Sequence, residues 1–180
     1  PLYFWNDENN ERYYESYFDT FPGVWRHGDW IKITPRGSCQ IYGRSDSTIN
    51  RGGIRMGTSE IYSAVESIDG IEDSLVVDVS DEKGKAYMPL FVVLQEGVVL
   101  DDALKAEIAA RIRKHCSPRH VPNDVFAIDE VPRTLNGKKL EVPIKKILMG
   151  FPLEKAVNKG SMSNPETLDY FIEFAKKMEN

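Results

Sequence analysis

A lysine at the tip of a predicted tight turn is the residue in this chain whose type and position best suit chemistry. Residues 131–139 place the pair Asn136-Gly137 directly before Lys138. Asn-Gly is a strong turn signal because both residue types tolerate a positive φ. A lysine on such a loop presents a compact cation on a flexible stem, which suits an oxygen anion that must be reached, neutralised and released. A solvated basic turn is the alternative that this stretch alone leaves open.

Two groups of opposite charge flank a predicted β-hairpin. Residues 30–33 and 40–42 have strand character, and Pro-Arg-Gly at 35–37 predicts a turn between them. Asp29 precedes the first strand and Arg44 follows the second, so an antiparallel pairing brings both to the same end of the hairpin. The two side chains could form a simple ion pair, or they could bind a ligand that carries a polyol and a phosphate.

A glycine-rich stretch follows the hairpin. Residues 51–57 read Arg-Gly-Gly-Ile-Arg-Met-Gly, and glycines at this density would let the backbone approach a ligand closely. The order does not fit GxGxxG, and no Gly-Lys-Ser/Thr follows, so neither a Rossmann fingerprint nor a P-loop is present. A flexible connector is the alternative.

Composition excludes several classes of protein. The chain has 180 residues and a formal net charge of −5, which argues against a general nucleic-acid binder. No run approaches the roughly 18 apolar residues that a membrane helix needs. Cys39 and Cys116 lack CxxC spacing, so we expect no metal site and a reducing, cytoplasmic location. The chain begins without a methionine or a signal peptide, so we expect it to be part of a longer protein.

The predicted elements form a small α+β domain with a three-stranded sheet and packed helices. Residues 1–26 carry more aromatic side chains than so short a segment can bury by itself, which indicates the end of a larger domain. In the first part of the chain we expect a helix over 11–20 capped by Asn10, followed by the hairpin. Next we expect a helix from its cap Thr58 to Gly70, strands over 75–79 and 90–94, and a helix from Asp101 or Asp102 to Cys116. A strand over 125–128, a helix over 140–149 and a tail helix capped by Asn164 complete the expected elements.

Four motifs, in this order, resemble the late motifs of the AMP-forming acyl-CoA synthetases of the adenylate-forming superfamily. They are His-Gly-Asp at 27–29, Gly-Arg-Ser-Asp at 43–46, Gly-Gly-Ile-Arg at 52–55 and Pro-Arg-Thr-Leu-Asn-Gly-Lys at 132–138. The resemblance covers nearly the whole chain but only the last part of such an enzyme. Residues 57–62, 116–122 and 137–143 and the long tail bring it closest to the branch that activates acetoacetate.

The resemblance implies a domain organisation and a set of roles. Residues 1–45 would end the large N-terminal domain, 46–150 would form the mobile C-terminal domain, and 151–180 would form a tail helix. The substrates would be Mg-ATP and coenzyme A, bound largely by the N-terminal domain. That N-terminal domain of the same protein would be the partner of this chain. The implied roles are Lys138 as the catalytic adenylation lysine, Asp29, Arg44 and Arg55 on the nucleotide, Gly53 and Arg113 on coenzyme A, and Asp46 as the hinge.

Some alternatives stay open. Relatives often carry Ser-Gly-His-Arg where this chain has Gly-Gly-Ile-Arg, and a second acid where Ser47 stands. The acid could be acetate, propionate or a longer acid, because the acyl pocket is not in this chain. An adenylation domain feeding a carrier protein fits less well, since Arg113 suits free coenzyme A. A free-standing α+β binding module is the alternative from another class. We expect the chain by itself to have no synthetase activity.

Overall fold

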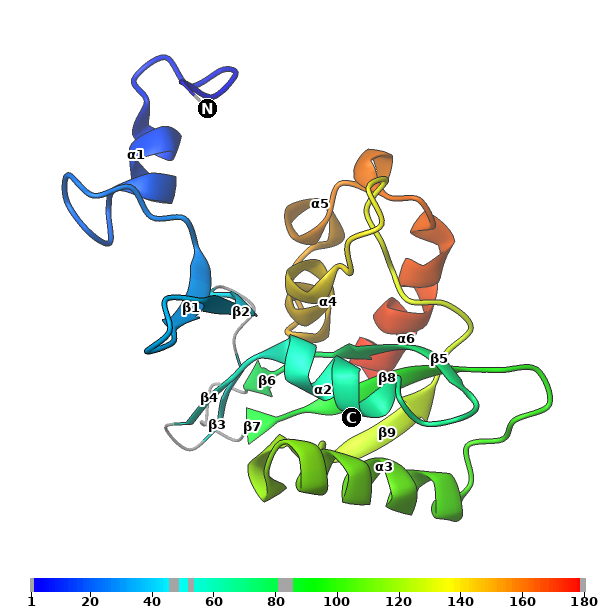
Figure 1. The fold of residues 1–180 in the computed structure, drawn as a ribbon. Helices are drawn as coiled ribbons and strands as arrows, with labels where there is room; N and C mark the ends of the chain where they lie inside the picture. The colour runs from blue at the N-terminus through cyan, green and yellow to red at the C-terminus, as the bar shows by residue number, and fades with distance from the viewer. Residues whose placement is uncertain (1, 46–48, 52–53, 81–85, 179–180) are drawn as a thin grey trace. The chain divides into compact units, whose positions relative to one another are not determined.

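The chain divides into two compact units. The structure, a computed structural model, describes residues 2–45, 49–51, 54–80 and 86–178 (Figure 1). The first unit is Pro1–Ser45 and the second is Asp46–Asn180. Two predicted site residues, Asp46 and Gly53, lie outside the described residues, as does the side chain of Arg55.

The first unit consists of one helix and one hairpin. Helix α1 (Glu11–Tyr17) is shorter than predicted. Asn10 occupies the N-cap position, as predicted, but it has φ 55° and its side chain makes no capping hydrogen bond. The carboxylate of Asp7 accepts from the backbone N–H groups of Arg12 and Tyr13 instead. Strands β1 (Asp29–Ile33) and β2 (Cys39–Arg44) form the predicted antiparallel hairpin.

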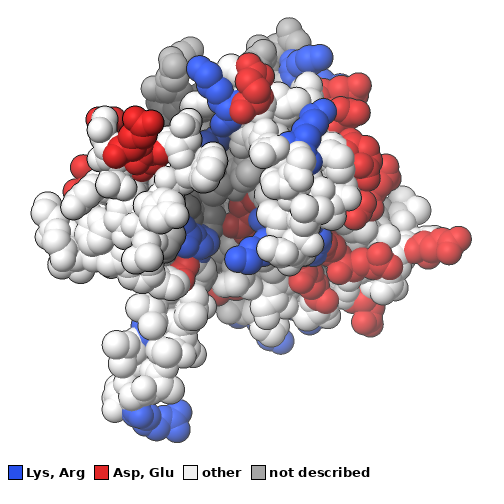
Figure 2. Space-filling model, turned by 90° about the horizontal axis from the view of Figure 1, so that it is seen from above, with Lys and Arg blue, Asp and Glu red and all other residues white. Residues whose placement is uncertain are grey.

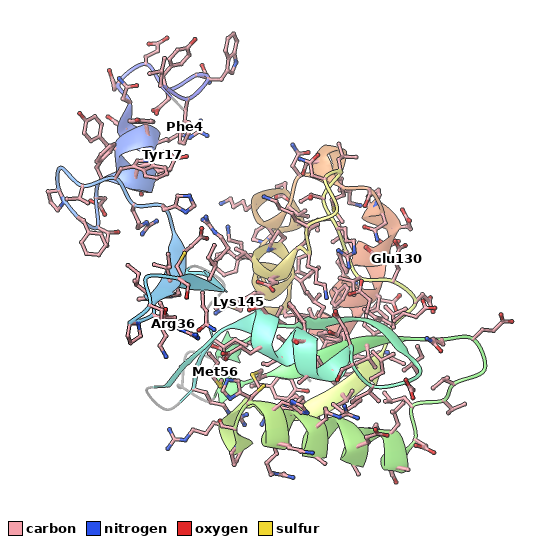
Figure 3. All side chains as sticks on the ribbon, in the orientation of Figure 1. Phe4, Tyr17, Arg36, Met56, Glu130 and Lys145 are labelled. Atoms are coloured by element: carbon pink, nitrogen blue, oxygen red, sulfur yellow. The ribbon has the colours of Figure 1, made fainter. Side chains whose placement is uncertain are left out.

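Aromatic side chains of this unit pack on one another without forming a buried core. The rings of Phe4 and Tyr17 lie 5.8 Å apart, on the same side of α1 in Figure 3. Trp5 is nevertheless 89% exposed, and Ile33 on β1 is also exposed. No described hydrophobic side chain of residues 2–45 is buried. Apolar surface of this kind is typical of an interaction site.

The second unit is built on a three-stranded sheet, as predicted. Its order is β5 (Ile71–Val76), β8 (Pro89–Leu94), β9 (Asp124–Ala127), with β8 antiparallel to β5 and parallel to β9. The apolar composition of β8 predicted a central strand, which is confirmed. Successive β8 side chains point to opposite faces: Leu90 packs into one hydrophobic cluster and Phe91 into the other.

Helices cover both faces of this sheet. Helices α2 (Thr58–Val65) and α3 (Asp102–His115) pack over the cluster that contains Leu90. Helices α4 (Glu141–Leu148), α5 (Leu153–Ala156) and α6 (Leu168–Met178) pack over the opposite face (Figure 1). The remaining elements are short: β3 (Ile49–Arg51) with β4 (Ile54–Met56), β6 (Val79–Ser80) with β7 (Ala86–Tyr87), and 3-10 turns at Pro118–His120, Lys159–Ser161 and Pro165–Thr167.

Several predicted boundaries are corrected. Helix α2 ends at Val65 rather than Gly70, and its cap is Gly57, because Thr58 already lies inside the helix. Strand β5 accordingly begins at Ile71, four residues before the predicted start. The cap of α3 is confirmed, since the Asp101 side chain accepts from the Leu104 N–H at 2.8 Å.

The tail belongs to the second unit. Phe171 on α6 is 1% exposed, and its ring lies 5.0 Å from that of Phe91 on the central strand. Leu168 of the same helix is fully buried. Residues 168–178 therefore help to form the core of the unit.

The surface carries charges of both signs. The face seen in Figure 2 shows Asp and Glu side chains interspersed with Lys and Arg rather than one continuous basic patch. Within the described residues, no helix is long and apolar enough to cross a membrane.

Candidate active-site loop and nucleotide site

The loop after β9 forms the predicted turn, with Lys138 at its end. The Gly137 N–H donates to the Thr134 carbonyl at 2.8 Å, and the Thr134 N–H donates to the Lys138 carbonyl at 2.9 Å. Within this turn only Gly137 has a positive φ, of 76°. The turn is therefore not the two-residue type in which Asn and Gly both take positive φ, but a longer one closed by a left-handed glycine.

The base of the loop is held by a network of charged side chains. Lys139 Nζ lies 2.6 Å from Glu66 Oε1 and 2.7 Å from Asp73 Oδ1, and it also donates to the Ser74 carbonyl at 2.7 Å. Its side chain is only 16% exposed. Arg133 pairs with Asp73 and donates to the Gly137 carbonyl at 2.6 Å. The network ties the loop to β5 and to Glu66, the residue that follows α2.

These cations set the protonation state of Asp73. Burial acts to raise the pKa of this carboxyl group, but hydrogen bonds from Lys139 and Arg133 outweigh that effect, and the net shift is downward. Asp73 is thus ionised at neutral pH and anchors both cations.

Lys138 has a different environment. Its backbone N–H donates to Thr134 Oγ1 at 3.1 Å, which fixes its main chain. Its side chain is exposed, and among the described residues no ion pair joins its ammonium group. The loop therefore presents a positively charged amine on an anchored backbone, ready to meet an external anion.

The C-terminal tail braces the same loop on its other side. The Leu135 N–H donates to the Ser161 carbonyl at 3.0 Å, and the Ser163 N–H donates to the Arg133 carbonyl at 3.1 Å. The side chain of Asn164 accepts from the Arg133 N–H and donates to the Val131 carbonyl. A 3-10 turn begins at Pro165 with Asn164 at its N-cap position, as predicted, but the Asn164 side chain makes no cap bond and contacts the loop instead.

The charged pair of the first unit lies at the base of the hairpin, as predicted. Asp29 is paired in register with Arg44, and Arg44 Nη1 lies 3.6 Å from Asp29 Oδ1. His27 Nδ1 lies 2.6 Å from Asp29 Oδ2, and Arg44 Nη1 donates to the His27 carbonyl at 3.2 Å. Gly28, at φ 88°, leaves room for this arrangement, because a Cβ there would lie 2.9 Å from Arg44 Nη2.

This pair is accessible to a ligand. The Asp29 side chain is 23% exposed and that of Arg44 is more than half exposed. An ion pair is therefore present in the structure, yet it is open to solvent. A carboxylate of this kind can accept two hydrogen bonds from neighbouring hydroxyl groups, and the guanidinium can contact a second oxygen.

Arg113 lies away from the lysine loop. It is an exposed residue in the last turn of α3, beside Lys114 and His115. Helix α3 covers one face of the sheet, whereas Val131 and Leu140 of the loop belong to the hydrophobic cluster on the other face. The structure therefore does not bring Arg113 and Lys138 together.

A polar cleft between α2 and α3 was not predicted. It has a volume of about 490 Å³ and is lined by Ser59, Glu60, Ser63, Ala64, Ser67, His115 and Cys116. Burial, followed by the charge of Glu60, raises the pKa of the Cys116 thiol. Nearby, His120 is buried with its Nδ1 2.8 Å from Ser117 Oγ. Within the described residues, no three His, Cys, Asp or Glu side chains are grouped to hold a metal ion.

Comparison with known proteins agrees with this fold. Residues 60–138 match the family model described as the AMP-binding enzyme C-terminal domain, and the match ends at Lys138 itself. Residues 60–138 therefore correspond to an AMP-binding enzyme C-terminal domain.

Several proteins that are similar to this chain along most of its length are acetoacetyl-CoA synthetases. The chain is 44% identical to the one from Rhizobium meliloti (strain 1021) over 171 residues, which is 95% of this chain and 26% of that protein. It is 44% identical to the mouse (Mus musculus) enzyme over 172 residues, or 95% of this chain and 25% of that protein. The solved acetoacetyl-CoA synthetase from Streptomyces lividans matches with a TM-score of 0.90 and 53% identity, over 99% of this chain and 26% of that one. The chain thus spans about a quarter of the length of these relatives.

Proposed function

We propose that this chain is part of an ATP-dependent acid–CoA ligase that converts acetoacetate, ATP and coenzyme A to acetoacetyl-CoA, AMP and diphosphate. The observation that carries the proposal is the similarity to acetoacetyl-CoA synthetases along 95% of the chain. An anchored loop that presents an exposed lysine agrees with it.

The first half-reaction is adenylation. A carboxylate oxygen of acetoacetate attacks the α-phosphorus of Mg-ATP, and the bond from that phosphorus to the diphosphate oxygen breaks. Lys138 places its ammonium group between the carboxylate oxygen and the α-phosphate, where negative charge gathers. A charge placed in this way stabilises the transition state more than the ground state, which is what accelerates the step.

The second half-reaction is thioester formation. The sulfur of coenzyme A attacks the acyl carbon of the adenylate, its proton is lost, and AMP leaves with the electrons of the broken bond. Gly53 borders the path of the thiol, and Arg113 contacts the nucleotide end of coenzyme A. Arg55 contacts phosphate. These assignments follow from the resemblance of the motifs and from the exposure of Arg113.

Asp29 and Arg44 hold the nucleotide in both half-reactions. Asp29 accepts from the two ribose hydroxyl groups and Arg44 supplies a further ribose contact. The open ion pair at the base of the hairpin supports this role, because ribose can replace Arg44 as the partner of one carboxylate oxygen. Residues 1–45 then form the end of the large N-terminal domain, and their exposed aromatic side chains pack on the rest of it.

A domain rotation lets one site serve both steps. Residues 46–150, together with the tail 151–180, turn about Asp46 so that Lys138 is presented first and Gly53 second. The described boundary between the two compact units, after Ser45, is where such a hinge would lie. The two free cysteines suit a reducing, cytoplasmic compartment.

The proposal is tested with the full-length protein. We expect it to release AMP in the presence of acetoacetate, ATP and coenzyme A, and more slowly with acetate or propionate in place of acetoacetate. Faster turnover of another acid would contradict acetoacetate as the substrate but would still agree with an ATP-dependent acid–CoA ligase. The 180-residue chain alone should form no acetoacetyl-CoA, so appreciable turnover by it would contradict the division of the active site between two domains.

A further inference from the structure

Asn164 is a buried polar residue that contacts the lysine loop from a distant part of the chain. It is 3% exposed. Its Oδ1 accepts from the Arg133 N–H at 2.9 Å, and its Nδ2 donates to the Val131 carbonyl at 3.0 Å. One side chain thus satisfies a donor and an acceptor of the loop backbone, two residues apart. A buried backbone group that loses its partner is costly, so both bonds hold the loop in one conformation.

Neighbouring tail residues continue the same contact toward the tip of the loop. Thr134 and Met162 form an isolated antiparallel bridge, and the Leu135 N–H donates to the Ser161 carbonyl. Met162 is itself buried in the hydrophobic core, so the brace rests on a fixed support. The tail therefore pairs with the loop up to three residues before Lys138.

The tail lies outside the residues that match the domain family. The match covers residues 60–138, whereas the brace is formed by residues 161–164. The contacts that hold the Lys138 loop on this side therefore come from a segment beyond the matched domain. The charged network of Lys139 and Arg133 ties the same loop to Glu66 and Asp73.

We propose that Asn164 is a positioning residue for the adenylation lysine, acting through the backbone of residues 131–135. The inference rests on the proposed function, which makes Lys138 the lysine of the first half-reaction. A long, exposed side chain is placed only as accurately as its own backbone, and a displacement of about 1 Å in a reacting group can cost on the order of 100-fold in rate. Asn164 touches no substrate in this scheme, so it affects only the step that uses Lys138.

The test compares four forms of the full-length enzyme: wild type, Asn164→Ala, Lys138→Ala and the control Asn158→Ala. Asn158 is another tail asparagine whose side chain bonds within the tail, to the Gly160 N–H at 3.0 Å. Adenylation is followed by acetoacetate-dependent exchange of labelled diphosphate into ATP. Thioester formation is followed from preformed acyl-adenylate and coenzyme A. Hydrogen exchange of the peptide covering 131–140 reports on the loop without reference to activity.

We expect Asn164→Ala to raise hydrogen exchange over 131–140 and to slow adenylation by about 10- to 100-fold, the range over which supporting residues act. Thioester formation should change far less, and Asn158→Ala should behave as wild type. The melting temperature of Asn164→Ala should fall by a few degrees, because two backbone groups lose their partner. The variant Asn164→Asp keeps the acceptor for Arg133 and loses the donor to Val131, so its adenylation rate should fall between those of wild type and Asn164→Ala.

Other results would overturn the inference in distinguishable ways. Unchanged hydrogen exchange in Asn164→Ala would show that Asn164 does not brace the loop. Raised exchange with normal adenylation, while Lys138→Ala is impaired, would show that the brace does not position the lysine. Equal losses in both half-reactions would indicate a structural role alone. Normal adenylation by Lys138→Ala would overturn the proposed function of that lysine, and the positioning role with it.

Discussion

Lys138 and Lys139 are consecutive residues with opposite environments. The ammonium group of Lys139 is held by Glu66 and Asp73 at 2.6 and 2.7 Å, whereas the side chain of Lys138 is exposed and, within the described residues, in no ion pair. One lysine fixes the loop to the body of the domain, and in the proposed function its exposed neighbour acts on the ligand. Under that proposal, two consecutive residues have separate structural and chemical roles.

This separation predicts different effects on stability. Lys139→Ala leaves Glu66, Asp73 and the Ser74 carbonyl without their shared donor, so the free energy of unfolding should fall by about 1–3 kcal/mol. Lys138→Ala removes an exposed side chain and should change it by less than about 0.5 kcal/mol. Urea unfolding of both variants measures the difference. Similar losses for the two would contradict the assignment of Lys139 as the anchor.

Acid should destabilise the second unit through Asp73. Because the folded pKa of Asp73 lies below its ordinary 3.8, its contribution to stability is complete above the unfolded pKa and is lost as the pH falls through the folded pKa. We therefore expect the free energy of unfolding to fall as the pH drops below about 4.

The same decline should be smaller in Asp73→Asn, which has already lost the ionisable group. Glu72→Gln changes an exposed neighbour on β5 and serves as the control, with a decline like that of wild type. Urea unfolding between pH 5 and pH 2.5 gives the slopes. If Asp73→Asn kept the full decline, the charged network would not be its source.

The tail should be part of the folded core rather than an appendage. Phe171→Ala removes a ring that is 1% exposed and packs on Phe91, so it should cost about 3–5 kcal/mol. Phe151→Ala removes a half-exposed ring and is the matched control, with a clearly smaller loss. Thermal unfolding of the two variants tests this. A small loss at Phe171 would mean that the tail does not complete the core.

The two cysteines should differ in reactivity. Burial and the charge of Glu60 raise the pKa of Cys116, so little of its thiol is ionised near neutral pH, while Cys39 is exposed. Iodoacetamide at pH 7.5 should therefore label Cys39 faster. Mass spectrometry of timed samples, with Cys39→Ser to isolate Cys116, gives the two rates. Faster labelling of Cys116 would contradict the burial of its thiol and its raised pKa.

Local sequence signals predicted the three-stranded sheet, the hairpin and the turn of Lys138. An apolar run without alternation indicated that residues 90–94 are central, and antiparallel pairing brought Asp29 to Arg44. These features depend on residues close together in the sequence, or on the burial of a single strand. Motif order alone sufficed to indicate the family.

Contacts between distant segments could not be predicted in the same way. Asn164-Pro165 fits a helix start, and nothing local shows that the Asn164 side chain bonds to residues 131 and 133 instead. Lys139 likewise reads as one of two equivalent lysines until Glu66 and Asp73 are placed beside it. The side chain of Asn10 makes no cap bond, because the Asp7 carboxylate accepts from N–H groups in the first turn of the helix instead.

The most direct measurement separates the two half-reactions in full-length Lys138→Ala. We predict that acetoacetate-dependent diphosphate exchange falls by about 100-fold or more, the loss typical of removing a group that stabilises transition-state charge. Transfer of the acyl group from preformed adenylate to coenzyme A should stay close to the wild-type rate. Equal loss of both steps, or normal exchange, would contradict the account.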